Sequence, residues 1–380
     1  MVANANNDPV KDIITLSVSI DLPKDIDFQL PPTYLSFDPT DIGFPTIREE
    51  IISDLKINWG DGSITEGITH RYSKRGDYTI TITGTGIYSF LYRNNNFTAI
   101  DVRKCPNLEL LDCTNNALTT GLGLTNCPHL KGLRCDGCPI SLLDLSRCPK
   151  LEYLYCDYSG IERIIFGNSI ASLINVRCNN NKLTSLDLSE AKLLRGLSCS
   201  SNQLKELRLG ENNSLRWLYC NGNQLKELRF GAYNSLEELS CSNNQIETLQ
   251  LGINIAQSMF MKISCDDNNI ENLEISSERY VSLDCSNNRI KNLDLRQCQV
   301  IPRINAPYNQ LENLYIDNNC IMEFVNFSCN GLDAAALNRI YEVLPTKSQW
   351  VTNCQIFIVG NNSTGDKSIA VAKGWKVIDS

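Results

Sequence analysis

Leucine and cysteine alternate with polar residues in a short segment that returns about every 21 residues along most of the chain. Clear copies are Leu111-Asp112-Cys113, Leu154-Tyr155-Cys156, Leu197-Ser198-Cys199, Leu218-Tyr219-Cys220 and Leu283-Asp284-Cys285. Alternation with a period of two predicts a short strand that buries the leucine and the cysteine on one face. A fixed short period predicts a solenoid, because each coil buries its apolar side only against the next coil.

Two columns of residues define the repeat. The column that holds the cysteine predicts about twelve coils and reads Tyr92, Cys113, Cys135, Cys156, Cys178, Cys199, Cys220, Cys241, Cys265, Cys285, Ala306 and Phe327. Three residues after the cysteine column lies a column of asparagine. The third and fourth coils are the exceptions, with Cys138 and Ser159 in place of asparagine. An asparagine at this place is expected to hydrogen-bond the backbone of the turn that follows the strand.

The pattern L-x-x-L-x-C-x-x-N-x-L-x-x-L-x-L-S resembles the leucine-rich-repeat proteins of bacterial surfaces, of the internalin-like and BspA-like kind. The resemblance covers roughly residues 88 to 332. It implies a solenoid with a curved sheet on its concave side, and it implies an exported protein that binds a partner through that sheet.

The two ends of the chain have different patterns. Three blocks in the N-terminal part resemble the PKD family of immunoglobulin-like β-sandwiches over about residues 10 to 84, and they are Trp59-Gly60-Asp61-Gly62-Ser63, His70-Arg71-Tyr72 and the strand from Gly76 to Ile82. After the last coil, Asp333 to Leu344 has apolar residues at helical spacing with Asp333 as N-cap, and a strand, a short helix and a final strand follow. This tail resembles the closing segment of Bacteroidetes-type repeat proteins.

The predicted fold is therefore mainly β. We expect a PKD-like β-sandwich over 1–87, a leucine-rich-repeat solenoid over 88–332 and a C-terminal α/β cap over 333–380. The terminal parts would cover the apolar ends of the solenoid.

Charge and cysteine usage restrict the partners. A net charge of -8 argues against nucleic acid, since phosphate binding needs concentrated Lys and Arg. Thirteen of the 17 cysteines fall in equivalent positions of the repeat and are interpreted as small buried apolar residues. No apolar run has the length of a membrane span, and no leader is visible at the N-terminus. Either the protein is cytosolic or a leader has been removed. We favour a cell-surface or secreted protein, with or without a lipid anchor.

Catalysis and metal binding have little support in the sequence. Asp136 and Asp157 occupy one column of adjacent coils, so their carboxyl groups are expected about 5 Å apart, as in retaining glycosidases. Arg134 and Arg177 lie near enough to neutralise both acids. The two histidines are far apart, and the C-x-x-C at Cys135 lacks the second ligand pair of a zinc site. We therefore expect a protein that is not an enzyme and has no metal or cofactor.

The concave face is the predicted binding surface. Residues that flank the inward leucine and cysteine point outward there, and Trp, Tyr and Arg are enriched at binding hot spots. The predicted ligand-binding residues are Arg134, Tyr153, Tyr155, Arg177, Trp217 and Tyr219. We expect adhesion to an extracellular or host protein. The alternatives are a carbohydrate-binding module that stacks sugars on the four aromatic residues, and a structural spacer in which those residues only stabilise the sheet.

Overall fold

The computed structural model describes residues 11–21, 24–27, 52–211, 214–231, 233–254, 260–277 and 280–380. The chain divides into two compact units, Met1–Leu183 and Thr184–Ser380, each built largely from coils of a β-solenoid.

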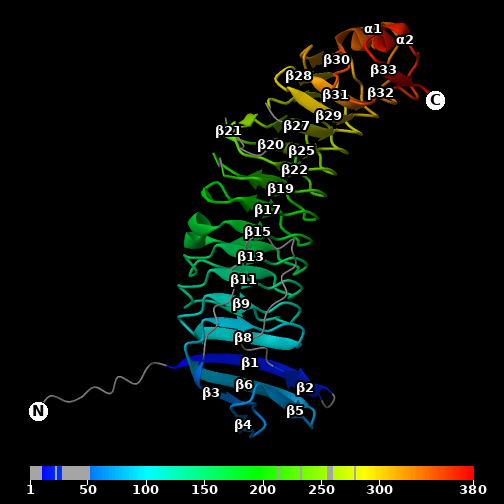
Figure 1. The fold of residues 1–380 in the computed structure, drawn as a ribbon. Coiled ribbons are helices and arrows are strands. Elements are labelled where there is room, and N and C mark those ends of the chain that lie inside the picture. Colours follow the sequence, from blue (N-terminus) through cyan, green and yellow to red (C-terminus); the bar gives the residue numbers. More distant parts are fainter. Residues whose placement is uncertain are drawn as a thin grey trace, which may run out of the picture. The chain divides into compact units, whose positions relative to one another are not determined.

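The first unit begins with a six-stranded sheet (Figure 1). Its strands, in the order in which they pair, are β10 (Leu122–Gly123), β8 (Phe97–Lys104), β1 (Asp12–Ile20), β6 (Gly76–Thr85), β3 (Ser53–Asn58) and β4 (Ile64–Thr65). A separate pair joins β2 (Lys24–Asp27) to β5 (Thr69–Tyr72). Because β8 belongs to the first coil and pairs antiparallel with β1, this sheet joins the N-terminal segment to the solenoid and extends past residue 87.

The predicted W-G-D-G-S turn is structural. Trp59 is fully buried, and the Tyr72 hydroxyl donates to the Trp59 carbonyl oxygen at 2.5 Å. Asp61 Oδ1 accepts from the Ser63 amide at 3.0 Å, and Asp61 Oδ2 lies 2.7 Å from His70 Nε2. Gly60 is required by geometry, because its φ is +82° and a Cβ there would lie 2.6 Å from the Thr79 carbonyl oxygen.

Parallel strands of successive coils form the main sheet of the first unit (Figure 1). They are β7 (Ser89–Leu91), β9 (Leu110–Asp112), β11 (Gly132–Arg134), β13 (Tyr153–Tyr155) and β15 (Asn175–Arg177). On the opposite side of the coils lie β12 (Leu142–Asp144), β14 (Arg163–Ile165) and a 3-10 helix at Gly167–Ser172. The leucine and cysteine columns point between the two sides and are buried, as the alternation predicts.

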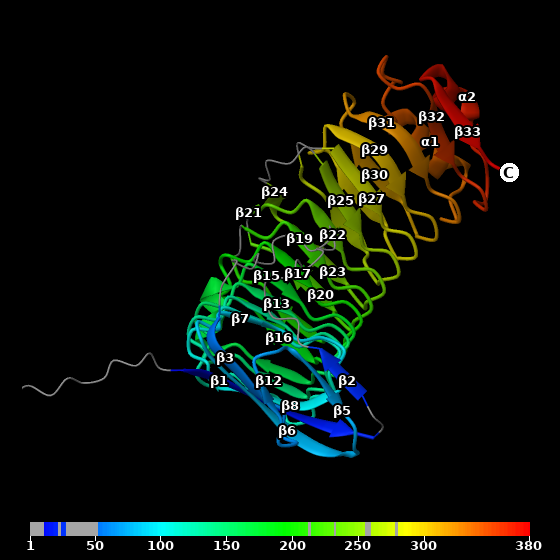
Figure 2. The ribbon, with the colours of Figure 1, turned by 60° about the horizontal axis from the view of Figure 1, so that its bottom comes forward.

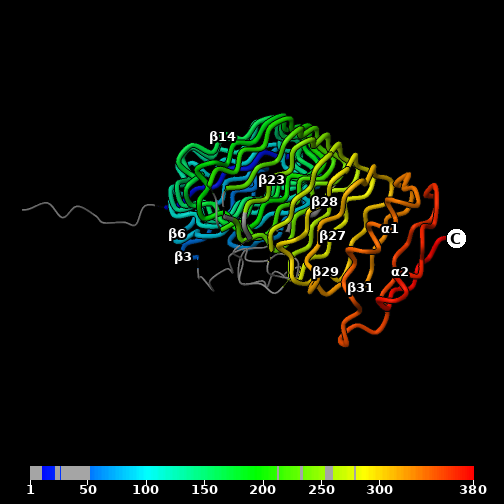
Figure 3. Tube along the Cα trace, turned by 90° about the horizontal axis from the view of Figure 1, so that it is seen from above, coloured from blue at the N-terminus to red at the C-terminus, as the bar shows by residue number. Residues whose placement is uncertain are grey.

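The second unit is itself built from coils of the same kind (Figures 2 and 3). Its main sheet contains β17 (Gly196–Ser198), β19 (Trp217–Tyr219), β22 (Glu238–Ser240), β25 (Phe260–Ser264), β27 (Tyr280–Asp284), β29 (Val300–Asn305), β31 (Ile321–Asn326), β32 (Cys354–Phe357) and β33 (Trp375–Ile378). The opposite side carries β16 (Ser185–Asp187), β18 (Glu206–Arg208), β20 (Glu227–Arg229), β23 (Thr248–Gln250), β26 (Asn272–Glu274), β28 (Asn292–Leu295) and β30 (Asn313–Ile316). A small pair, β21 (Tyr233–Asn234) and β24 (Ile253–Asn254), lies in the connecting segments.

The asparagine column forms a buried polar ladder, which confirms the sequence prediction. Asn288, for example, is 8% exposed. Its Nδ2 donates to the carbonyl oxygens of Cys265 and Cys285 at 3.0 and 3.2 Å, and its Oδ1 accepts from the Ile270 amide at 3.0 Å. Since one of these partners lies in its own coil and two lie in the preceding coil, each asparagine joins neighbouring coils through their backbones.

A second column, one residue before the ladder, holds the backbone in the left-handed region. Asparagine, glycine or aspartate fills most of its positions, as expected for positive φ. Tyr158 (φ +55°) and Tyr308 (φ +56°) are two of the exceptions, and their side chains are 70% and 60% exposed.

All 17 cysteines are free thiols, and all except the half-buried Cys329 are buried. Burial raises the pKa of Cys220 to about 12, so this thiol stays protonated and packs as a small apolar group. The pKa of Cys148 is likewise raised to about 12, by burial first and by nearby Cys127 and Asp144 second.

A helical cap closes the second unit. Helix α1 (Ala334–Val343) begins after Asp333, whose Oδ1 accepts from the Ala336 amide at 2.8 Å. Helix α2 (Lys367–Ala372) precedes the last strand, β33, and the Trp375 Nε1 donates to the Pro345 carbonyl oxygen at 2.8 Å. The predicted helix, N-cap, short helix and final strand are therefore confirmed.

Candidate functional site

The outward face of the main sheet in the first unit is ordered in rows, because its strands pair in exact parallel register. The middle row runs across β9, β11, β13 and β15 through Asp112, Arg134, Tyr155 and Arg177. The row on one side of it runs through Leu110, Gly132, Tyr153 and Asn175. Four of the six predicted binding residues thus come together in one cluster, Arg134, Tyr153, Tyr155 and Arg177.

Tyr155 is the centre of this cluster. The guanidinium carbons of Arg134 and Arg177 lie 5.0 and 5.2 Å from its ring centroid, one on each neighbouring strand. Tyr155 is only 1% exposed and packs with Leu110 and Tyr153. The expectation that Tyr155 offers its ring to a ligand is therefore revised: the ring is covered, and it holds the two guanidinium groups in place by cation–π contact.

Two acidic residues fix the outer ends of the arginines. Arg134 Nε lies 3.2 Å from Asp136 Oδ2, and Arg177 Nη2 lies 3.1 Å from Asp157 Oδ2. The carboxylates are also held by backbone, since the Asp157 amide donates to Asp136 Oδ1 at 2.7 Å and the Asn179 amide donates to Asp157 Oδ1 at 2.6 Å. Both arginine side chains retain some exposure, 16% for Arg134 and 35% for Arg177. The cluster is therefore a pre-organised surface of guanidinium and aromatic groups with little net charge.

Asp136 is the titratable group of the cluster. Burial raises the pKa of Asp136 from its usual 3.8 to about 6, and the negative charge of Asp157 adds to the rise. The hydrogen bond from the Asp157 amide and the charges of Arg134 and Arg177 oppose it without cancelling it. Asp136 therefore gains a proton under mildly acidic conditions.

The row ends at a buried ion pair. Asp112 is fully buried and accepts from Arg93 Nε at 2.7 Å and from the Thr114 hydroxyl at 2.7 Å. Arg93 Nη2 lies 2.5 Å from Asp112 Oδ2, the same oxygen that accepts from Arg93 Nε. This pair neutralises the acid and has a structural role.

The sequence analysis missed Tyr158, which directly follows Asp157, the ion-pair partner of Arg177. Its ring is 70% exposed and its backbone adopts the left-handed conformation that favours asparagine or glycine. A strained backbone that displays a large exposed side chain is an indication of function rather than of stability. The signal in the sequence was the tyrosine in a column otherwise rich in asparagine and glycine.

The other two predicted residues, Trp217 and Tyr219, lie on β19 of the second unit, on either side of the buried Leu218. The Tyr219 hydroxyl donates to Glu238 Oε2 at 2.7 Å, and Lys262 Nζ lies 2.9 Å from Glu238 Oε1. Burial acts to raise the pKa of Glu238, but the hydrogen bonds from Lys262 and Tyr219 outweigh it and hold that pKa below its usual value. Trp217 and Tyr219 are half-buried, and Gly196 and Ser198 are their partners on β17.

The same face of the second unit carries a further group that the sequence analysis did not include. The Arg303 guanidinium carbon lies 4.3 Å from the centroid of the Phe324 ring, and the Phe324 and Phe357 centroids are 5.1 Å apart. Arg303 and Phe324 are register partners on β29 and β31. They occupy the position just before the inward apolar residue, as Trp217 does on β19, so the repeat spacing contained the signal.

Within the described ranges, no group of three or more His, Cys, Asp or Glu side chains is placed to hold a metal ion. In the same part of the chain, no helix combines the length and the apolar character that crossing a membrane requires.

The known proteins found to be similar to this chain are solved structures. No protein-family model matches the sequence, and no curated protein matches it. The functional domain of InlJ from Listeria monocytogenes, described as including a cysteine ladder, is similar at 21% identity and a TM-score of 0.46, over 72% of this chain and 65% of that domain. The internalin inlF from the same species is similar at 15% identity and a TM-score of 0.41, over 77% of this chain and 87% of that one. YopM, a leucine-rich effector protein from Yersinia pestis, gives 22% identity and a TM-score of 0.36, over 63% and 83% of the two chains.

Proposed function

We propose that this protein is a non-catalytic binding and adhesion protein of the cell surface or the secreted fraction, which recognises a protein partner through the concave face of its repeat sheet. The observation that supports the proposal most directly is the stack of Arg134, Tyr155 and Arg177 on three adjacent strands. In this proposal the PKD-like segment over 1–87 and the tail over 333–380 cap the solenoid over 88–332.

Pre-organisation is the physical reason for assigning binding to this cluster. An arginine that must be ordered on binding loses side-chain entropy, which weakens the complex. Here the Tyr155 ring and the two carboxylates already hold both guanidinium groups while part of each remains exposed. Tyr153 packs with Tyr155, and the exposed Tyr158 directly follows Asp157 in the chain. Tyr and Arg are among the residue types enriched at binding hot spots.

The experiment is a binding screen of the whole chain against a panel of extracellular and matrix proteins, with Tyr158→Asn tested in parallel. Asparagine fills the equivalent position in other coils, so this variant should fold at least as stably as the parent. Tyr308→Asn is the matched control, because it makes the same change at the same backbone conformation in the second unit. We expect Tyr158→Asn to weaken the complex by about tenfold, which corresponds to ~1.4 kcal/mol for the loss of one aromatic contact.

Three other outcomes would redirect the proposal. Equal binding by Tyr158→Asn and the parent chain would place the partner elsewhere. A neutral glycan that binds the parent chain and is lost on Trp217→Ala would favour the carbohydrate-binding alternative. If the parent chain binds nothing on the protein panel or on a glycan array, the spacer alternative gains support.

A further inference from the structure

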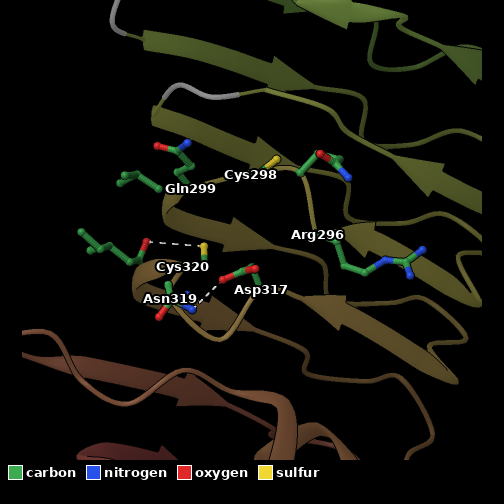
Figure 4. Close-up of a pocket in the computed structure, with 9 residues that line it drawn as sticks. Arg296, Cys298, Gln299, Asp317, Asn319 and Cys320 are labelled. Carbon is green, nitrogen blue, oxygen red and sulfur yellow. Dashed lines mark hydrogen bonds between the residues drawn. The ribbon is translucent and has the colours of Figure 1, made fainter.

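The second unit contains a pocket that is separate from the residues considered above (Figure 4). Its volume is about 470 Å³, within the range of ordinary small-molecule sites. It lies where two successive coils turn into β29 and β31, and it is lined by Arg296, Gln297, Cys298, Gln299, Val300, Asp317, Asn319, Cys320 and Ile321.

Most polar side chains of the lining are amides. Gln297, Gln299 and Asn319 are exposed, and none of their side chains makes a hydrogen bond to another residue in the described part of the chain. Such amides offer both a donor and an acceptor. They suit a ligand whose own groups both donate and accept, and the hydroxyl group is the simplest of these.

The charged groups of the lining do not favour an anion. Arg296 is held by Asp294, with Arg296 Nη2 at 2.5 Å from Asp294 Oδ2, and its guanidinium carbon lies 5.2 Å from the centroid of the Tyr315 ring. Figure 4 shows Arg296 extending away from Gln299 and Cys320. Asp317 Oδ1 accepts from the backbone N–H of Asn319 at 2.7 Å, and within the described residues no cation of the lining is bound to this carboxylate.

An apolar row leads to the pocket along the outward face of the sheet. Phe260, Tyr280, Val300 and Ile321 are register partners on β25, β27, β29 and β31, and the last two also line the pocket. Phe260 and Tyr280 are 66% and 39% exposed, with ring centroids 5.3 Å apart. Two neighbouring exposed rings are an unusual feature for a surface that contacts water alone.

From these observations we propose that the pocket and the adjoining Phe260–Tyr280 pair form a binding site for a neutral oligosaccharide. A sugar ring has an apolar C–H face and a rim of hydroxyl groups. The exposed rings would cover the C–H face of one sugar unit, while the amides and Asp317 bind the hydroxyl groups of the next unit in the pocket. The lack of an unpaired cation in the lining disfavours phosphate, sulfate and acidic sugars.

The test uses the full chain on an array of neutral oligosaccharides with gluco, galacto, manno and xylo configurations. Tyr280→Ala removes a stacking ring, and Gln299→Ala removes an amide of the pocket. Trp350→Ala is the matched control, because Trp350 is an exposed aromatic residue of the same unit (79% exposed) that belongs neither to the row nor to the pocket. Circular dichroism of each variant verifies that it is folded.

We expect the parent chain and Trp350→Ala to bind the same glycan equally. Tyr280→Ala should weaken that binding about tenfold and Gln299→Ala about threefold or more, as for loss of one aromatic contact and one hydrogen bond. The proposal is overturned if the parent chain binds no neutral glycan, or if both pocket variants bind as tightly as the parent. Loss of glycan binding in Tyr158→Asn with retention in Tyr280→Ala would also overturn it, because the glycan would then bind the first unit. The protein-partner screen is independent of this result, so the two proposals fail separately.

Discussion

The polar ladder makes a quantitative prediction about stability. Asn288→Ala removes a side chain that is 8% exposed and that bonds the Cys265 and Cys285 carbonyl oxygens and the Ile270 amide. The alanine leaves these backbone groups without a partner in a place that water hardly reaches. At about 1 kcal/mol per lost hydrogen bond, the free energy of unfolding should fall by about 3 kcal/mol. Asn288→Ser should cost less, because in another coil the Ser159 hydroxyl donates to the Cys135 carbonyl oxygen at 2.8 Å.

Chemical denaturation followed by circular dichroism measures this loss, and amide hydrogen exchange localises it. Asn353→Ala is the matched control, since Asn353 is exposed and its side chain bonds no described residue. In Asn288→Ala the Ile270 amide should exchange faster, while amides in α1 keep their protection. If Asn288→Ala and Asn353→Ala differ by less than about 1 kcal/mol, the ladder is not what stabilises the coils, and the reasoning from its hydrogen bonds is refuted.

Three further predictions concern single groups. Asp136 has a folded-state pKa of about 6 against a usual 3.8, so the folded chain binds this proton more tightly than the unfolded chain does. The stability that protonated Asp136 contributes is therefore lost as pH rises from about 4 to about 6. Asp136→Asn should remove that part of the pH dependence of the melting temperature, and an unchanged profile would contradict the assignment. Cys220→Ser places a hydroxyl in a fully buried apolar column and should cost about 1–3 kcal/mol in denaturant titrations, whereas Cys329→Ser, at a half-buried site, should cost less than about 0.5 kcal/mol. Asp333→Ala removes the N-cap of α1 and should lower the free energy of unfolding by about 1 kcal/mol, with Asp333→Asn restoring most of it.

The fold was predictable because the same sequence pattern recurs in many coils. The L-x-C alternation, its spacing and the asparagine three residues later each occur in many coils, and all three agree on one register. The cap was predictable from local signals instead, since Asp333 and Pro345 bracket a helical pattern just after the last coil.

The candidate site was only partly predictable, because periodicity gives the face on which a side chain lies and not what covers it. Tyr155 lies in the outward row as expected, yet it is buried among Leu110, Tyr153 and two arginines. Whether a side chain is covered by its neighbours depends on contacts between strands and between rows, and these contacts have no fixed spacing in the sequence. The pocket beside Gln299 arises from the shape of two turns, and turn shape is likewise not encoded by the repeat period.

The two asparagine-rich columns separate stability from function within each coil. The ladder asparagine is buried and bonds the neighbouring coil, so nearly any replacement there costs stability. The residue before it needs a left-handed backbone, and asparagine or glycine adopts that conformation more readily than other residues. A tyrosine at that position therefore lowers stability without improving the stacking of the coils. Tyr158 directly follows Asp157, the ion-pair partner of Arg177, whereas Tyr308 follows Pro307 in the second unit. If Tyr158 contacts the partner, Tyr158→Asn should gain stability while it loses binding, and Tyr308→Asn should gain stability alone.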